Sequence, residues 1–166
     1  CIPAASLNSY FIPDLSYAYL AGFTEETLKF AAIYFYIRKK TDFDEPMDAI
    51  VYGTLISLGF ATLENFQYVY SAGNPDFIAT LRAFTAIPLH ACCGIIMGYY
   101  FGLYIFKDKN RLNLFKSLFL AIAFHASYNY FATRNVLLMF FVLIVLIIFA
   151  KKLHTLLKAE QLSKQS

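Results

Sequence analysis

Long apolar runs separated by short polar connections dominate the chain. A membrane-spanning helix needs about 20 predominantly apolar residues, and five stretches reach this length. They cover approximately residues 15–37, 47–70, 83–106, 112–132 and 135–153. No repeat, low-complexity tract or soluble second region interrupts this pattern. The pattern therefore predicts an all-α, polytopic transmembrane helix bundle with at least five transmembrane helices, built as a single domain over residues 1–166.

The composition supports a membrane-embedded protein. Of the 166 residues, 59% are hydrophobic, 19% are aromatic and only 15% are charged, and the mean hydropathy is +0.53. These values lie outside the usual range of soluble domains. The net charge of +3 is too small to indicate a nucleic-acid partner, so the expected surroundings are the lipid bilayer. Cys92 and Cys93 are adjacent in an apolar run, which favours packing over a disulfide or a metal pair.

Lysine and arginine are distributed unevenly between the connections. If successive helices cross in alternate directions, one side holds only Arg82 and Arg134. The other side holds eleven such residues: Arg38, Lys39, Lys40, Lys107, Lys109, Arg111, Lys116, Lys151, Lys152, Lys158 and Lys164. Positively charged connections stay in the cytoplasm. We therefore expect the first helix to enter from outside and the C-terminus to be cytoplasmic.

Four of the five apolar segments carry polar residues that a lipid-facing helix would not tolerate. A charge at the bilayer centre costs about 2.5 to 3.5 kcal/mol even on the lenient insertion scale. At about 1.5 Å per residue, Glu25, Glu64, His90 and His125 lie roughly 9 to 15 Å from the outer ends of their helices, and Asn129 is shallower. Because these helices enter from both sides, a common depth indicates one cluster in the outer half of the membrane.

Small residues share helix faces with this polar cluster. His90 is followed by glycines at intervals of four residues, which are Gly94, Gly98 and Gly102. Gly53 lies on the face of its helix that carries Glu64. Small residues let helix backbones approach closely. The pattern therefore predicts that polar side chains from several helices reach one another.

The cluster offers two kinds of chemistry. Two histidines and up to three carboxylates match the ligand set of zinc or a similar divalent ion with one position open to water. A nearby carboxylate would take a proton from water that attacks a carbonyl, and an amide such as Asn129 would stabilise the oxyanion. The same residue types also build intramembrane proton and cation pathways. The residues alone favour a hydrolase and a proton-coupled or cation transporter about equally, and a non-catalytic membrane scaffold is a third reading.

Four ordered stretches resemble the successive motifs of the PrsW family of intramembrane proteases. They read "EETLK", "GFATLEN", "IPLHACCGIIMGYYFG" and "HASYN", and the resemblance runs from about Gly22 to Phe131. The family belongs with the type II CAAX prenyl proteases and bacteriocin-processing membrane proteases in a wider superfamily. The residues that match its motifs are the paired Glu25 and Glu26 with Lys29, then Glu64, then His90, and finally His125 with Asn129.

The resemblance implies endoproteolysis of a membrane-anchored protein near the extracytoplasmic side of a bacterial cell membrane. By analogy with the family's namesake, it implies an anti-sigma factor as the substrate. Family members usually carry further helices ahead of the paired glutamates, whereas 24 residues precede Glu25 here. We therefore expect the N-terminal helices of the family to be absent from this chain.

Residue chemistry and the resemblance together predict a role for each member of the cluster. Glu25 or Glu26 is the expected general base, and Asn129 the expected oxyanion donor. The two glutamates are about 100° apart on a helix, so we expect them to have different roles. Three further residues are expected to bind Zn²⁺, or to activate water without a metal; they are Glu64, His90 and His125.

Overall fold

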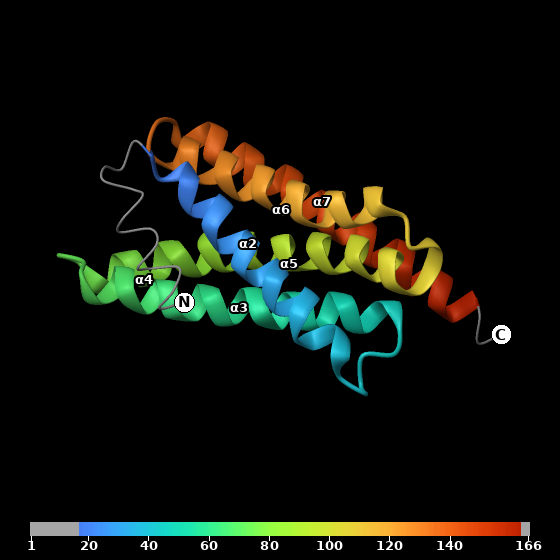
Figure 1. Cartoon of the computed structure of the whole chain (residues 1–166). Coiled ribbons are helices and arrows are strands. Elements are labelled where there is room, and N and C mark those ends of the chain that lie inside the picture. The colour runs from blue at the N-terminus through green and yellow to red at the C-terminus, as the bar shows by residue number, and fades with distance from the viewer. Residues whose placement is uncertain (1–16, 164–166) are drawn as a thin grey trace.

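Helices make up nearly all of residues 17–163, the part of the chain that the computed structural model describes, and this part contains no β-strand (Figure 1). The all-α prediction is therefore confirmed. In chain order the elements are α2 (Tyr19–Phe35), the 3₁₀-helix η2 (Ile37–Lys39), α3 (Pro46–Tyr70), α4 (Pro75–Phe84), α5 (Ala86–Leu103), the π-helix η3 (Tyr104–Asp108), α6 (Arg111–Ala132) and α7 (Val136–Ser163).

Local capping signals set several of the helix ends. α3 begins with a capping box in which the Glu45 and Asp48 side chains each accept from the other's backbone N–H, and Pro46 occupies the first helical position. The Asn110 side chain caps α6 by accepting from the backbone N–H of Leu112 at 2.9 Å. Lys109, just before this cap, adopts a left-handed conformation with φ of 49°. These residues end one helix and start the next within a few positions.

Three helical stretches within residues 17–163 are long and apolar enough to cross a membrane. They are Pro46–Tyr70, Pro75–Asp108 and Val136–Ser163, with mean hydropathies of 1.3, 1.5 and 2.7. α7 exposes large apolar side chains such as Leu137, Phe141 and Ile148, as expected of a lipid-facing helix. α2 buries Glu25, Glu26 and Lys29, and α6 buries Ser117 and His125, so polar residues lower the hydropathy of both helices. The expectation of at least five transmembrane helices thus stays a prediction for these two.

Two helix boundaries differ from the sequence prediction. The predicted start of the third apolar segment at residue 83 missed α4, which Asn74 caps by accepting from the Phe77 backbone N–H at 3.2 Å. α7 also continues ten residues past the predicted end at residue 153. Its polar last turns contact the rest of the bundle, since Lys107 pairs with Glu160 at 2.5 Å. Capping residues and tertiary pairing, which hydropathy does not measure, account for both differences.

The glycines of α5 bring that helix into backbone contact with α3. A Cβ atom added at Gly94 would lie 2.6 Å from the carbonyl oxygen of Gly53, and one added at Gly98 would overlap the carbonyl of Ala49. No side chain could move aside, because the atoms in the way belong to the backbone. This confirms the close helix approach that the small-residue spacing predicts.

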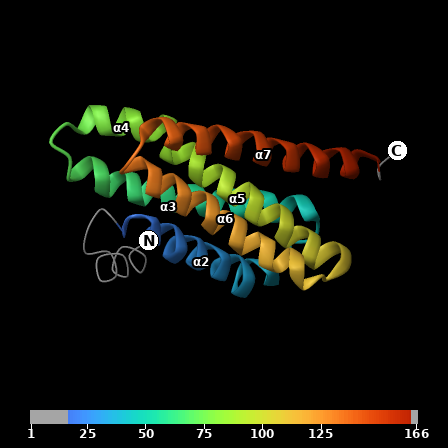
Figure 2. The same cartoon turned by 90° about the horizontal axis from the view of Figure 1, so that it is seen from above.

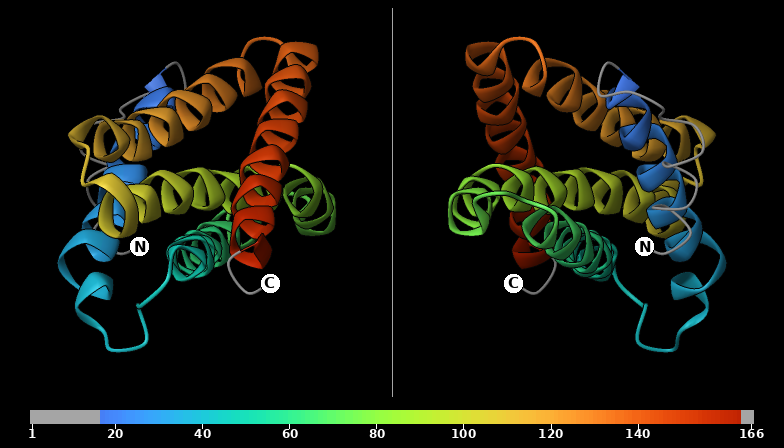
Figure 3. Two further views of the ribbon diagram at one scale, coloured as in Figure 1. Left: turned by 90° about the vertical axis from the view of Figure 1, so that its right-hand side faces the viewer. Right: turned by 90° about the vertical axis from the view of Figure 1, so that its left-hand side faces the viewer.

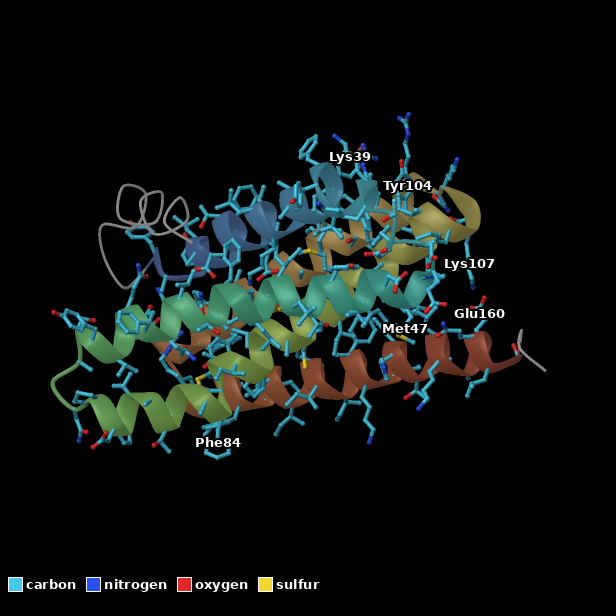
Figure 4. All side chains as sticks on the ribbon, turned by 90° about the horizontal axis from the view of Figure 1, so that it is seen from below. Lys39, Met47, Phe84, Tyr104, Lys107 and Glu160 are labelled. Atoms are coloured by element: carbon cyan, nitrogen blue, oxygen red, sulfur yellow. The ribbon has the colours of Figure 1, made fainter. Side chains whose placement is uncertain are left out.

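α5 lies at the centre of the bundle, between α3 and α6 (Figures 1 and 3). Seen from above, α2 and α7 run along opposite sides of the bundle, with α5 and α6 between them (Figure 2). Lys39, Tyr104, Lys107 and Glu160 gather at one end, which is also the end where α7 finishes (Figure 4). The arrangement therefore places helices from three directions around the polar face of α5, and it gathers basic connections at one end.

Candidate active site

Four helices bring the predicted polar residues together in the interior. Glu25 and Glu26 come from α2, His90 from α5 and His125 from α6, and their exposed fractions are 4%, 0%, 1% and 1%. Glu64 comes from α3, and its side chain is 18% exposed. Charged groups this deeply buried require polar partners. The contacts among them therefore determine what the site can do.

Glu26 connects α2 to α6 through one carboxylate oxygen. Its Oε1 accepts a hydrogen bond from Lys29 Nζ at 2.6 Å and lies 2.7 Å from His125 Nδ1. Because a carboxylate accepts, Nδ1 of His125 carries the ring proton and Nε2 keeps the lone pair. Glu26 thus fixes both the orientation and the tautomer of this imidazole.

His90 is held from both sides by groups of opposite charge. Lys29 Nζ lies 2.7 Å from Nδ1 of His90, and Glu64 Oε2 lies 3.0 Å from Nε2. An ammonium group can only donate, so Nδ1 accepts and the ring proton sits on Nε2, from which it donates to Glu64. The buried Lys29 therefore links the two histidines, because it contacts His90 directly and His125 through Glu26.

Arg82 of α4 is the last member of this series of hydrogen bonds, beyond Glu64. Its Nη2 donates to Glu64 Oε2 at 2.7 Å, and its Nε donates to Asn65 Oδ1 at 2.6 Å. The guanidinium group also lies 3.9 Å from the ring centroid of Tyr68. Donors and acceptors alternate without a break from Arg82 through the cluster to His125. The site is consequently one connected network.

Glu25, His90 and His125 form a group that could hold a metal ion. Each offers one ligand atom, and these atoms lie within 4.8 Å of one another. The two imidazole rings are 4.9 Å apart between centroids and nearly perpendicular, at 81°. One carboxylate and two imidazoles are a ligand set typical of catalytic zinc, in which the ligating histidines also contact carboxylates. His125 and His90 have such contacts, with Glu26 and Glu64 respectively.

The charge balance of the cluster agrees with this fit. Three carboxylates, those of Glu25, Glu26 and Glu64, face two basic side chains, those of Lys29 and Arg82. When all five are ionised, the cluster carries an excess negative charge that a cation would neutralise. Oε2 of Glu26 is buried and has no hydrogen-bond partner among the described residues. A buried acceptor of this kind suits a site that receives a donor such as water.

The two adjacent glutamates occupy different environments, as their separation around the helix predicts. Glu25 belongs to the Glu/His/His group, whereas Glu26 pairs with Lys29 and His125. Sequence spacing placed Glu25 and Lys29 on one face, but the ion pair forms at the i, i+3 spacing from Glu26. Glu64, an expected metal ligand, contacts His90 and Arg82, and Glu25 takes the third place in the group.

Asn129 and Arg82 differ most from the sequence expectations. The amide of Asn129 donates to the Ala18 carbonyl oxygen at 3.2 Å, which ties α6 to the start of α2. Its expected role as an oxyanion donor stays a prediction. Arg82 was counted only as an outer positive charge, yet it contacts Glu64. The sequence did contain a feature that could have predicted this contact: Arg82 closely follows the apolar segment that carries Glu64, which has no basic residue of its own.

The chain matches the family described as PrsW family intramembrane metalloprotease over residues 4–151. The chain belongs to the PrsW family. Proteins named Protease PrsW are among its relatives. The protein from Bacillus subtilis is 40% identical over 128 residues, which cover 76% of this chain and 56% of the relative. The protein from Geobacillus kaustophilus is 40% identical over 111 residues, 66% of this chain and 48% of the relative.

A relative from Clostridioides difficile, also named Protease PrsW, is 34% identical over 116 residues, 67% of this chain and 49% of the relative. The chain thus spans about half the length of the curated PrsW relatives it matches. No solved structure matches it at a significant level. Membership in the family confirms the resemblance found in the four motifs. Together with three helices able to cross a membrane, it identifies an integral membrane protein.

Proposed function

We propose that this PrsW family chain is an intramembrane endopeptidase that hydrolyses a peptide bond of a membrane-anchored protein near the extracytoplasmic side. The observation that carries the proposal is the buried group of Glu25, His90 and His125, in which three helices bring one carboxylate and two imidazoles together. A membrane interior does not accommodate such residues without a role. By analogy with the family's namesake, an anti-sigma factor is the proposed substrate.

The residues divide the chemistry between them. When no metal is bound, Glu25 is the proposed general base, because its carboxylate lies within the group and can take a proton from an attacking water. Nε2 of His125 presents a lone pair to the site, because Glu26 holds the proton on Nδ1. Asn129, one helical turn after His125, has a second amide N–H with which to stabilise the developing oxyanion.

Zn²⁺ is the proposed cofactor, and the residues that would hold it are Glu25, His90 and His125. Such an ion polarises a carbonyl and makes water more acidic. We expect the purified protein to contain about one zinc ion per chain by mass spectrometry of the metal content. Glu25→Gln and His125→Ala should lower that content, because each removes a ligand.

Two further measurements distinguish this ligand set from its alternatives, which are a different ligand set and a mechanism without a metal. Glu64→Gln should retain zinc but cleave more slowly if Glu64 acts by orienting His90. Zinc loss equal to that of His125→Ala would instead favour the ligand set of Glu64, His90 and His125. Undiminished cleavage by metal-free protein would favour a glutamate and a histidine that activate water without a metal.

Co-expression with a single-pass substrate tests the proposed activity. The chain should cut the substrate into two fragments, and mass spectrometry should place the cut in the outer half of the substrate's membrane segment. A parallel measurement in proteoliposomes addresses transport by the same residues. Proton or cation flux through the chain, with no cleavage of any single-pass substrate, would contradict the protease proposal.

The proposed topology places the C-terminus in the cytoplasm. Lys39, Lys107 and the end of α7 lie at one end of the bundle (Figure 4), and the positive-inside rule assigns that end to the cytoplasm. We expect a phosphatase reporter fused to the C-terminus to be inactive, because that enzyme folds only outside the cytoplasm. The same reporter inserted in the α6–α7 connection, near Arg134, should be active. The reverse pattern would contradict both the orientation and the outer location of the site.

A further inference from the structure

Arg82 makes three contacts with one face of α3, and the third is aromatic. Besides its hydrogen bonds to Glu64 and Asn65, the guanidinium group stacks over Tyr68. A planar guanidinium with several fixed donors suits this geometry, because it can bond in two directions while its face covers a ring. A flexible surface ion pair would not satisfy all three contacts at once.

The contact with Glu64 differs from an ordinary surface salt bridge in two respects. The side chains of Arg82 and Glu64 are only 15% and 18% exposed, so water screens the pair weakly. The same oxygen, Oε2 of Glu64, also accepts a hydrogen bond from Nε2 of His90. Any shift of the carboxylate therefore shifts the acceptor that orients the His90 ring.

α4 lies at the edge of the bundle, and Arg82 is its charged side chain that points toward α3. None of the ten residues of α4 is buried, and its large apolar side chains Phe77, Leu81 and Phe84 are 60%, 40% and 76% exposed. Figure 4 shows Phe84 pointing away from the other helices. α4 thus contributes little to the core, yet it delivers one side chain to the catalytic network.

We propose that Arg82 is a positioning residue that acts through Glu64 to hold His90 in its productive orientation. The inference rests on the proposed protease function for its effect on rate, but not for its effect on His90 itself. Arg82 holds the Glu64 carboxylate in place from α4, Glu64 accepts from His90 Nε2, and Nδ1 of the same ring accepts from Lys29 Nζ. Removal of the guanidinium leaves the carboxylate free to rotate away from His90.

Arg82→Gln and Arg82→Lys are compared with the parent chain and with Arg134→Gln. Arg134 is a matched control, because it is the other outer arginine and also stacks on a tyrosine, with 4.1 Å to the Tyr130 ring centroid. We expect kcat to fall about 10- to 100-fold in Arg82→Gln, as for other residues that orient an active-site histidine. KM should change less than about twofold. Arg82→Lys should recover part of the rate, because lysine keeps the charge but cannot reach Glu64 and Asn65 together.

The second measurement is ¹⁵N NMR of histidine-labelled protein. The ring nitrogen signals of His90 should move in Arg82→Gln and stay in place in Arg134→Gln, while those of His125 change little. Unchanged kcat in Arg82→Gln would overturn the proposal. So would a slower variant whose His90 signals match the parent, because Arg82 would then only anchor α4. If the parent chain cleaves nothing, the protease function fails, and the His90 signals alone decide whether Arg82 positions this ring.

Discussion

Replacing His125 by alanine is expected to reduce cleavage of a co-expressed single-pass substrate at least about 100-fold, the lower end of what a general acid or base contributes. The same loss is expected for His90→Ala and Glu25→Gln. The physical reason is that each histidine variant removes one of the three ligand atoms that lie within 4.8 Å of one another, and Glu25→Gln replaces the carboxylate by a neutral amide. The measurement is the ratio of cut to uncut substrate on immunoblots at equal expression of each variant.

A variant at His154 provides the matched control for the histidines. This residue lies on α7 with an exposed side chain, apart from the cluster, so His154→Ala should cleave like the parent. Glu25→Gln nearly preserves side-chain volume, so its loss of activity would not reflect a cavity. Cleavage at the parent rate by all three site variants would refute the assignment of the active site.

Glu26→Gln separates the roles of the two adjacent glutamates in the same assay. Its amide could no longer carry the negative charge that pairs with Lys29 at 2.6 Å. Breaking a buried ion pair by removing one charge commonly costs about 3 to 5 kcal/mol of stability. Glu26→Gln should therefore lower both the activity and the thermal stability, whereas Glu25→Gln should lower mainly the activity.

The composition of the site was predictable from the sequence because membrane insertion penalises polar residues. Glu25, Glu64, His90 and His125 stood out in apolar segments at a common depth, and the structure brings them together: Glu64 contacts His90, and Glu25 lies in one group with both histidines. Their pairing was not predictable in the same way. Whether Lys29 bonds to Glu25 or Glu26 depends on side-chain rotamers, which helical periodicity leaves open, because i, i+3 and i, i+4 neighbours are both within reach.

The part of the fold that hydropathy predicted less well is the part that packs least. α4 is ten residues long and buries none of them, so its sequence gives a weak apolar signal next to the strong one of α5. The contact between Arg82 and Glu64 joins residues 18 positions apart, and it depends on the angle between α4 and α3. Tertiary geometry of this kind is absent from a one-dimensional pattern.

The α3–α5 contact is the second place where a large effect is expected. Gly98→Val should destabilise the protein severely, because a Cβ at this position would overlap the backbone of Ala49 and Ile50. Overpacking a core commonly costs about 1 to 3 kcal/mol, and more when neither neighbour can adjust. Here the obstructing atoms belong to the α3 backbone, so the two helices have to separate. Thermal unfolding of the purified protein in detergent measures this loss.

Gly59 of α3 is the control for that substitution. A Cβ atom at Gly59 would meet nothing within 4 Å, so Gly59→Ala should keep or slightly raise the unfolding temperature, as alanine favours helix over glycine by about 1 kcal/mol. Equal stability of Gly98→Val and Gly59→Ala would contradict the backbone contact between α3 and α5.

Separating α3 from α5 should also reduce activity in protein that still folds. α3 carries Glu64 and α5 carries His90, and their side chains are 3.0 Å apart at Nε2 and Oε2. A displacement of about 1 Å between reacting groups can cost about 100-fold in rate. The milder Gly98→Ala should therefore lose activity at temperatures where it remains folded, and His90 signals in ¹⁵N NMR should move with the loss. The glycine stripe of α5 and His90 lie on the same helix face, and close backbone packing sets the distance between Glu64 and His90.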